Sequence, residues 1–325
     1  MPVRPHASRL EDVQPPVHVI YSPRYVIDIG THVFPTIKYR LVRDWLIERG
    51  IVAPDELLEP DAAAWDDLAA VHTADYLDKL RTGVLTLQEQ ATLELPWAPG
   101  IVEGFRLMVG GTILAGQLAT GHRRARAGAA PAWPVVLHLG GGLHHGFVDH
   151  GEGFCVFNDV AVAIRKLQRD GAARRVAIID CDVHHGNGTA KIFTGDPNVF
   201  TFSIHQQQNY PAFKPQSSLD VGLPDGTGDV AYLDALAPAL PRVLDSRPDV
   251  VFYLAGADPY EDDQLGGLRL SMAGLRERDR RVFSAVKAAG VPLVVTLAGG
   301  YARHVEDTVA IHVATVEEAR RALHE

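Results

Sequence analysis

The sequence predicts an α/β fold with a central, mainly parallel β-sheet flanked by helices. Short apolar runs recur along the 325 residues, and helical patterns separate them. The runs are continuous rather than alternating, which is typical of strands buried on both faces. Clusters of Gly, His, Asp or Tyr directly follow five of the runs. That position is the edge at which open parallel sheets bind ligands.

The expected elements succeed one another along a single domain. Residues 1–16 include four prolines and predict an arm over the surface, and residues 17–325 carry the strand and helix pattern without a linker or repeat. The expected strands are Val17–Tyr21, Val135–Leu139, Val176–Ile179, Val199–Ile204, Val250–Leu254 and Leu293–Leu297. The expected helices are Thr36–Arg49, Ile101–Thr120, Asn158–Arg169 and Ala273–Ala289. Glycines near three helix ends fit C-terminal caps, whereas Gly110 and Gly111 weaken the helix that contains them.

The composition excludes several classes of protein. Lysine and arginine number 31 and aspartate and glutamate number 40, so the net charge is −9. This charge argues against nucleic acid or an anionic membrane as the main partner, and it suits a cationic substrate. Two cysteines, Cys155 and Cys181, exclude a disulfide framework. No apolar run approaches the ~18 residues of a membrane span, and the first residues lack a signal-peptide core, so a cytoplasmic location is expected.

Three side chains at expected strand ends have the spacing of a metal site. Asp182 and His184 lie two residues apart after the run Val176–Ile179, so they point to the same side of an extended segment. Asp258 follows the run Val250–Leu254 and can arrive from a separate strand. Oxygen and nitrogen donors suit zinc, and three protein ligands leave a position for water, as in catalytic sites. The alternative is that Asp182 and His184 only cap the following turn.

A pair of histidines, His144 and His145, follows three glycines at another expected strand end. Histidine has an ordinary pKa of ~6.5, so the pair offers a general base and a second acid or cation near neutral pH. The alternative is a pair with only a structural role, whose ring nitrogens are hydrogen-bonded inside the fold.

Tyr301 follows Gly299 and Gly300 at the last expected strand end. Its hydroxyl can donate a hydrogen bond to a developing oxyanion, or the ring can simply cover the rim of the core.

Together these motifs resemble the zinc-dependent histone deacetylase family, from about Tyr21 to about Tyr301. The matching stretches are Gly141–Gly146, Gly153–Asp159, Asp180–Gly188, Ala255–Asp258 and Gly299–Tyr301. The resemblance implies a single-domain arginase/deacetylase-like fold with an active site at the carboxyl ends of the strands. It also implies hydrolysis of an amide to a free amine and a carboxylate.

The resemblance implies that Asp182, His184 and Asp258 hold zinc, with one ion per chain. It also implies a structural potassium ion, held by oxygen atoms. The potassium residues would be Asp180, Asp182, His184, Ser203 and Ile204.

The resemblance further implies the catalytic roles. His145 would be the general base, and His144 its electrostatic or acid partner. Asp180 would orient His144, Asn187 would face His145, and Tyr301 would donate to the substrate carbonyl oxygen. The implied tunnel residues are Gly153, Phe154, Leu265, Gly299 and Gly300.

Within the family, class IV and its bacterial relatives look most similar. The stretches behind this are Tyr21–Tyr25, Leu223–Asp229 and Leu265–Leu268. Asn187 stands where class I members carry an aspartate, and a neutral partner raises the pKa of His145 less than a carboxylate would. The aspartate that class I members place at the mouth is not found in the stretch Leu95–Gly100, so the sequence does not predict tight binding of a peptide backbone.

The substrate stays open at this point. Acylated lysine and acylated small amines such as acetylpolyamines fit the same chemistry. Apolar Phe154 and Leu265 favour acyl-lysine and would let medium or long acyl groups compete with acetyl. One alternative is a non-catalytic module that binds acyl-lysine. Another is a binuclear metal ureohydrolase, which lacks ligands for a second metal because His185 and Pro259 follow the zinc-ligand positions. The sequence indicates no oligomeric state.

Overall fold

The computed structural model describes residues 17–123 and 133–324. Eight strands form one sheet in the order β2-β1-β3-β8-β7-β4-β5-β6, and every neighbouring pair is parallel. The strands are β1 (His18–Ile20), β2 (Leu57–Leu58), β3 (Val135–His138), β4 (Val176–Asp180), β5 (Val199–Gln206), β6 (Leu219–Leu223), β7 (Val250–Leu254) and β8 (Leu293–Thr296). The predicted parallel α/β fold is confirmed. The predicted arm, residues 1–16, lies outside the described residues.

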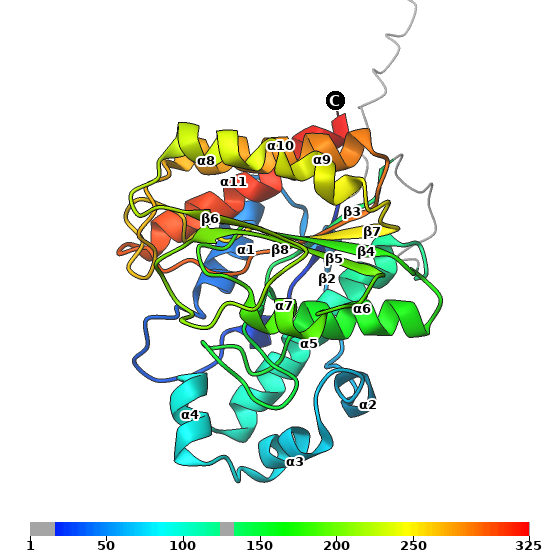
Figure 1. The fold of residues 1–325 in the computed structure, drawn as a ribbon, viewed down its shortest axis with the longest axis vertical. Coiled ribbons are helices and arrows are strands. Elements are labelled where there is room, and N and C mark those ends of the chain that lie inside the picture. The colour runs from blue at the N-terminus through cyan, green and yellow to red at the C-terminus, as the bar shows by residue number, and fades with distance from the viewer. Residues whose placement is uncertain (1–16, 124–132, 325) are drawn as a thin grey trace, which may run out of the picture.

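Helices cover both faces of the sheet (Figure 1). They are α1 (Lys38–Glu48), α2 (Trp65–Leu68), α3 (Ala74–Thr82), α4 (Leu87–Leu93), α5 (Pro99–Ala119), α6 (Asp159–Arg169), α7 (Asn187–Ile192), α8 (Asp229–Leu236), α9 (Ala239–Leu244), α10 (Met272–Ala288) and α11 (Val305–His324). Helices α8 to α11 lie on one side of the sheet and α5 to α7 on the other, with α2 to α4 beyond α5 (Figure 1). Helix α1 packs against α11.

Several strands and helices of the structure are not predicted from the sequence. Strand β6 is an edge strand with exposed and partly buried residues between its buried ends, so it lacks a continuous apolar run. Strand β2, at the other edge, has only two residues. The unpredicted helices α2, α3, α4, α7, α8 and α9 each have nine residues or fewer. Helix α11 is long, and Val305, Val309, Val313 and Val316 recur in it at helical spacing, a signal that the sequence does carry.

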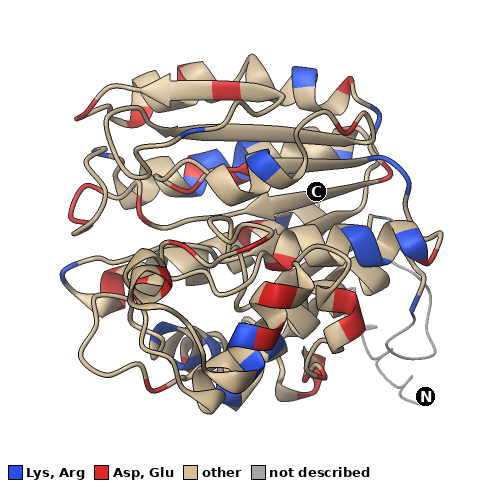
Figure 2. Cartoon of the chain, turned by 60° about the horizontal axis from the view of Figure 1, so that its bottom comes forward, with Lys and Arg blue, Asp and Glu red and all other residues tan. Residues whose placement is uncertain are grey.

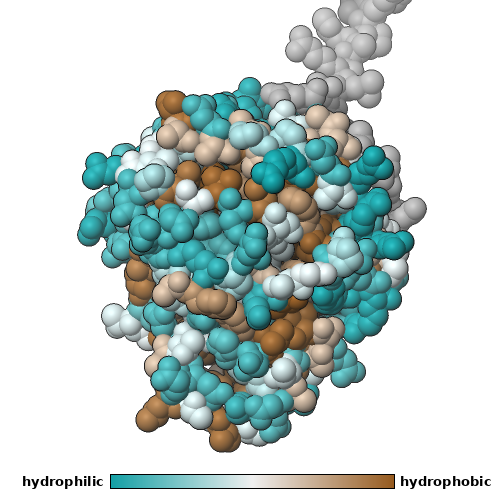
Figure 3. All heavy atoms as spheres, in the orientation of Figure 1, coloured by the Kyte–Doolittle hydropathy of each residue, from teal (hydrophilic) through white to brown (hydrophobic). Residues whose placement is uncertain are grey.

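The interior strands are apolar because both of their faces are covered. All residues of β3, β4, β7 and β8 are buried. In Figure 2 the charged residues lie mainly on helices and loops, and most of the sheet carries none. Hydrophilic side chains cover much of the face in Figure 3, and hydrophobic ones form smaller patches. None of the described helices has both the length and the apolar character needed to cross a membrane.

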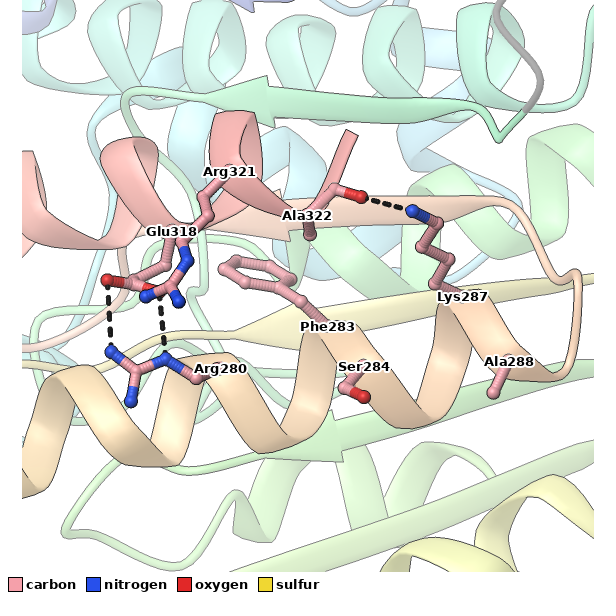
Figure 4. A pocket seen from close by; sticks show the side chains of 8 residues that line it. All are labelled: Arg280, Phe283, Ser284, Lys287, Ala288, Glu318, Arg321 and Ala322. Carbon is pink, nitrogen blue, oxygen red and sulfur yellow. Dashed lines mark hydrogen bonds and ion pairs between the residues drawn. The ribbon is translucent and has the colours of Figure 1, made fainter. Parts of the chain in front are cut away.

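The groove between α10 and α11 contains a cavity of about 430 Å³ (Figure 4). Its charged side chains are paired with protein groups. Arg280 Nε donates to Glu318 Oε2 at 3.2 Å, and Lys287 Nζ donates to the backbone oxygen of Ala322 at 2.6 Å. We therefore regard this cavity as part of the packing of the two helices.

Helix α5 runs without a break through Gly110 and Gly111, although glycine weakens a helix. A Cβ atom on Gly110 would overlap the backbone oxygen of Asp61, and one on Gly111 would overlap the ring of His138 in β3. The two glycines therefore allow α5 to pack closely against its neighbours.

Replacing Gly110 with alanine should destabilise the protein by about 1–3 kcal/mol, because the methyl group has no space beside Asp61. Gly100 provides a matched control in the first turn of α5, where a Cβ atom would meet nothing within 4 Å. Gly100→Ala should be neutral or slightly stabilising. Urea unfolding measures both free energies, and equal stability of the two variants would contradict the close packing of Gly110.

Candidate active site

The carboxyl ends of β3, β4, β7 and β8 supply the predicted metal-ligand residues, the histidine pair and Tyr301. Asp180 of β4 lies level with Leu254 of β7, and Leu254 lies level with Thr296 of β8. His138 of β3 is also level with Thr296. The segments that follow these residues therefore leave the sheet at one edge, and they carry the predicted histidines, aspartates and Tyr301.

Asp182, His184 and Asp258 form a buried cluster whose donor atoms lie within 4.8 Å of one another. His184 Nδ1 is 3.0 Å from Asp182 Oδ1 and 3.5 Å from Asp258 Oδ2. Backbone N–H groups hold the carboxylates, because Val183 donates to Asp258 Oδ1 and Gly299 donates to Asp182 Oδ2, each at 2.8 Å. One imidazole and two carboxylates thus face a common point.

This donor set fits a divalent metal ion such as zinc. Asp258 Oδ2 is buried and has no hydrogen-bond partner among the described residues, although buried carboxylate oxygens are normally satisfied. A Cβ atom on Gly299 would overlap carboxylate oxygens of both Asp182 and Asp258, so the glycine keeps the space beside them open. Oxygen and nitrogen donors in this combination are typical zinc ligands.

Protonation of His184 competes with metal binding. Burial alone would lower the pKa of His184, but its hydrogen bond with Asp182 and the nearby Asp258 carboxylate outweigh burial and raise the pKa to about 10. A metal ion must therefore displace a proton from this ring, and metal affinity should fall as the pH falls.

His144 and His145 lie beside the cluster, with their Nε2 atoms 3.1 Å apart. His144 Nδ1 donates to Asp180 Oδ2, and His145 Nδ1 donates to Asn187 Oδ1, each at 2.7 Å. Burial alone would lower the pKa of His144, but the Asp180 and Asp182 carboxylates raise it to about 9. Burial and the charge of His144 lower the pKa of His145 well below its usual value. At neutral pH His144 is the cation of the pair and His145 the neutral member.

Tyr301 borders a narrow cavity of about 20 Å³ beside the histidine pair. Burial, followed by the Asp182 and Asp258 carboxylates, raises the pKa of Tyr301 well above its usual value, so its hydroxyl stays a neutral donor. The ring of Phe154 stacks on Phe34 with their centres 6.0 Å apart. The predicted residues that line the cavity are His144, His145, Gly153, Phe154, Asp182, Gly299 and Tyr301.

Two predicted tunnel residues, Leu265 and Gly300, do not line this cavity. The backbone oxygen of Leu265 accepts a hydrogen bond from Asn209 Nδ2 at 2.8 Å. Gly300 lies under the site, where a Cβ atom would come within 3.0 Å of Ala257 Cβ.

The residues predicted for potassium include Asp182 and His184 of the metal-ligand cluster and three neighbours. The register of β4 and β5 pairs Asp180 with Ser203, and Ile204 follows in β5. The backbone N–H of Asp182 donates to Asp180 Oδ1 at 3.1 Å. Several oxygen-bearing groups therefore meet between the two strand ends.

Lys38, which the sequence analysis does not single out, is buried below the site. Its Nζ donates to the backbone oxygen of Ala298 at 2.8 Å and lies 5.7 Å from the centre of the Tyr301 ring. Burial lowers the pKa of Lys38 to about 8. In the sequence, Lys38 is an ordinary polar residue of a helical pattern, so no local signal indicates that its side chain is buried beside the site.

Two further buried residues support the loops that carry the site. Asp159, at the start of α6, accepts hydrogen bonds from the backbone N–H groups of Gly142 and Leu143 at 3.0 and 2.7 Å. Arg278 Nη1 donates to the backbone oxygen of Gly256 at 2.6 Å. The first holds the glycine segment before the histidine pair, and the second holds the segment before Asp258.

The wall and rim of the site also contain residues that sequence reasoning missed. The ring of Tyr210 lies edge-on to the ring of His145, with their centres 5.1 Å apart. Glu94 is exposed and has a φ of 59°. It directly follows Leu93, the last residue of α4, whose carbonyl oxygen accepts a hydrogen bond from the N–H of Phe154. Glu94 directly precedes the stretch Leu95–Gly100, in which the sequence offers no aspartate.

A second group of possible metal donors consists of His185, His205 and Asp220. His185 Nε2 already lies 3.2 Å from Asp220 Oδ1 and 3.4 Å from Ser217 Oγ. Asp220 is exposed, unlike the three residues of the buried cluster. A hydrogen-bonded histidine and aspartate account for this group without a metal ion.

Comparison with known proteins places these features in a family. A model of the histone deacetylase domain matches residues 32–316. An uncharacterized protein of Picosynechococcus sp. is 42% identical over 298 residues, which are 90% of this chain and 95% of that protein. Histone deacetylase 2 of Arabidopsis thaliana is 31% identical over 311 residues, 90% of this chain and 78% of that protein.

Two more similarities extend this result. Acetoin utilization protein AcuC of Bacillus subtilis is 31% identical over 306 residues, 87% of this chain and 76% of that protein. The crystal structure of the HDA15 HD domain has a TM-score of 0.75 and 24% identity, and it covers 95% of this chain and 88% of that chain. That structural match confirms the predicted type of fold.

Proposed function

Since the chain belongs to the histone deacetylase family, we propose that it is a zinc-dependent amidohydrolase that removes acetyl or longer acyl groups from lysine-type amines. Deacetylase activity is the general function that the family relationship supports. One observation carries the finer proposal: the histidine pair, Tyr301 and Asp182 of the metal-ligand cluster line the same cavity.

Asp182, His184 and Asp258 are the residues that would hold zinc. When bound, zinc lowers the pKa of a water molecule and polarises the substrate carbonyl. The Asp258 oxygen without a hydrogen-bond partner supports this assignment.

The remaining chemistry belongs to the side chains of the protein. His145 is neutral, and its Nδ1–H donates to Asn187, so its Nε2 carries the lone pair that can take a proton from the attacking water. His144, held by Asp180, contributes positive charge 3.1 Å away, and the pair returns a proton to the leaving amine. Tyr301 donates its hydroxyl hydrogen to the oxygen that becomes negative.

A direct test is hydrolysis of a fluorogenic acetyl-lysine amide, with and without a hydroxamate that binds zinc. We expect turnover that the hydroxamate inhibits, that a chelator abolishes and that added zinc restores. Binding of the substrate without turnover would support the non-catalytic module instead.

The pH dependence of kcat/KM should be broad. His145 must be neutral, and its lowered pKa means that activity persists as the pH falls below the ordinary histidine value of ~6.5. His144 must be protonated, and activity should be lost as the pH rises through about 9, or lower because a bound cation also lowers this pKa. Because the rings touch, the two apparent values belong to the pair. Loss of activity already on acidification to pH 7 would contradict these roles.

The small cavity favours acetyl over longer acyl groups. About 20 Å³ holds roughly one water molecule, so any acyl-lysine needs the walls to move, and a longer chain needs a larger movement. We expect kcat/KM for an acetyl-lysine peptide to exceed that for the octanoyl and myristoyl peptides, although apolar Phe154 would favour longer chains. A higher value for either long chain would mean that the wall around Phe154 opens.

An acetylpolyamine is the second candidate substrate, because the exposed Glu94, next to the residue whose carbonyl accepts a hydrogen bond from the N–H of Phe154, can attract a distant ammonium group. Acetylspermidine therefore belongs in the same measurement. A clear preference for it would change the proposed substrate and leave the proposed chemistry intact.

Three smaller proposals follow the family resemblance. Oxygen atoms around Asp180 and Ser203 would hold a structural potassium ion, supported by their pairing across β4 and β5. The protein would belong to class IV of the family. It would be located in the cytoplasm.

A further inference from the structure

Glu152 lies beside the histidine pair without lining the cavity, and it joins the wall of the site to His145. Its Oε1 atom accepts hydrogen bonds from Asn187 Nδ2 at 2.7 Å and from the hydroxyl of Tyr210 at 3.1 Å. Its Oε2 atom lies 3.5 Å from His150 Nε2. The side chain is 16% exposed, so these contacts form largely away from solvent.

The contact with Asn187 decides how that amide is oriented. An amide can present either its oxygen or its nitrogen to a neighbour, but a carboxylate can only accept. Burial would raise the pKa of Glu152, but its hydrogen bonds outweigh burial and lower it, so the group is ionised. The NH₂ group of Asn187 must therefore face Glu152, and its oxygen must face His145.

The orientation of Asn187 in turn selects the tautomer of His145. Asn187 Oδ1 accepts from His145 Nδ1 at 2.7 Å, so the proton lies on Nδ1 and the lone pair on Nε2. The backbone N–H of Gly188 also donates to Asn187 Oδ1, at 3.0 Å. Two restraints thus hold the amide, and only the one from Glu152 depends on a side chain.

We propose that Glu152 is a positioning residue that, through Asn187, keeps His145 in the tautomer with an unprotonated Nε2. This inference rests on the proposed function, because an unprotonated Nε2 matters for a reaction in which His145 takes a proton. The hydroxyl of Tyr210 reinforces the arrangement from the wall of the site, since it donates to the same oxygen of Glu152. Sequence alone gives Glu152 no role, because 35 residues separate it from Asn187.

Four single variants and one double variant test the proposal by steady-state kinetics. Glu152→Ala should lower kcat by ~10–100-fold, the usual cost of losing a supporting partner, with little change in KM. Glu152→Gln keeps an oxygen at Oε1 and should retain most of the activity. Asn187→Asp places two carboxylates together and should lower activity, and adding Glu152→Gln to it should recover activity, because the glutamine NH₂ can donate to Asp. His150→Ala, which alters only the Oε2 side, is the control with little expected effect.

A spectroscopic measurement separates this proposal from the proposed function. In zinc-loaded protein with ¹⁵N-labelled histidine rings, the His145 signals, assigned by their absence in His145→Ala, should report a proton on Nδ1. Glu152→Ala should shift the population towards the other tautomer, and Glu152→Gln should not. This readout holds even if the wild-type protein hydrolyses no acyl amide. An unchanged tautomer in Glu152→Ala, or equal losses of kcat in the alanine and glutamine variants, would overturn the proposal.

Discussion

Replacing Asp258 with asparagine should leave the protein folded but reduce its zinc from about one ion per chain to almost none, and with it all measurable hydrolysis. Asparagine keeps an oxygen that can accept from the N–H of Val183, so the loop should remain in place. The change falls on Oδ2, the oxygen that faces the cluster without a hydrogen-bond partner. Asp182→Asn and His184→Ala should have the same effect, because two remaining donors hold zinc poorly against water.

Metal content and activity should be measured together on each variant after incubation with zinc and gel filtration. Asp220→Asn is the matched control, since it removes the carboxylate of the second group of possible donors and should change neither quantity. Full zinc content in the Asp182, His184 and Asp258 variants would rule out the buried cluster as the metal site. Loss of zinc in Asp220→Asn alone would move the site to the second group.

The residues predicted for this cluster could be found from the sequence because each signal is local. Asp182 and His184 follow a buried strand at a spacing of two, and Asp258 follows another. In a parallel sheet all strand ends of one kind lie at one edge, so the prediction needed no knowledge of the strand order. The actual order puts β7 directly beside β4, which brings Asp258 to the other two residues.

The supporting residues could not be found in this way, because their roles depend on partners that are distant in the sequence. Lys38 in α1 donates to the backbone oxygen of Ala298, 260 residues away. Arg278 in α10 donates to the backbone oxygen of Gly256, in the segment after β7. Each looks like an ordinary polar residue in a helical pattern. Strand β6 was missed for a related reason, since an edge strand with exposed residues has no continuous apolar run.

The second large effect should come from the histidine pair, where the two rings have different expected roles. His145→Ala should lower kcat/KM by ~10²–10⁴-fold, the range for loss of a general base, while zinc stays bound. His144→Ala should cost less, because it removes a positive charge held by Asp180 and not the group that takes the proton. Zinc content serves as the internal control, since neither ring belongs to the metal-ligand cluster.

Because the two Nε2 atoms are 3.1 Å apart, each variant should also change the pKa of the remaining ring. In the wild type the charge of His144 lowers the pKa of His145, so His144→Ala should raise that pKa and move the acidic limb of the pH profile towards neutrality. His145→Ala leaves no such limb to move. If both variants lose activity equally and His144→Ala does not shift the profile, then the two rings act as one proton-sharing unit, and the division into base and cation is wrong.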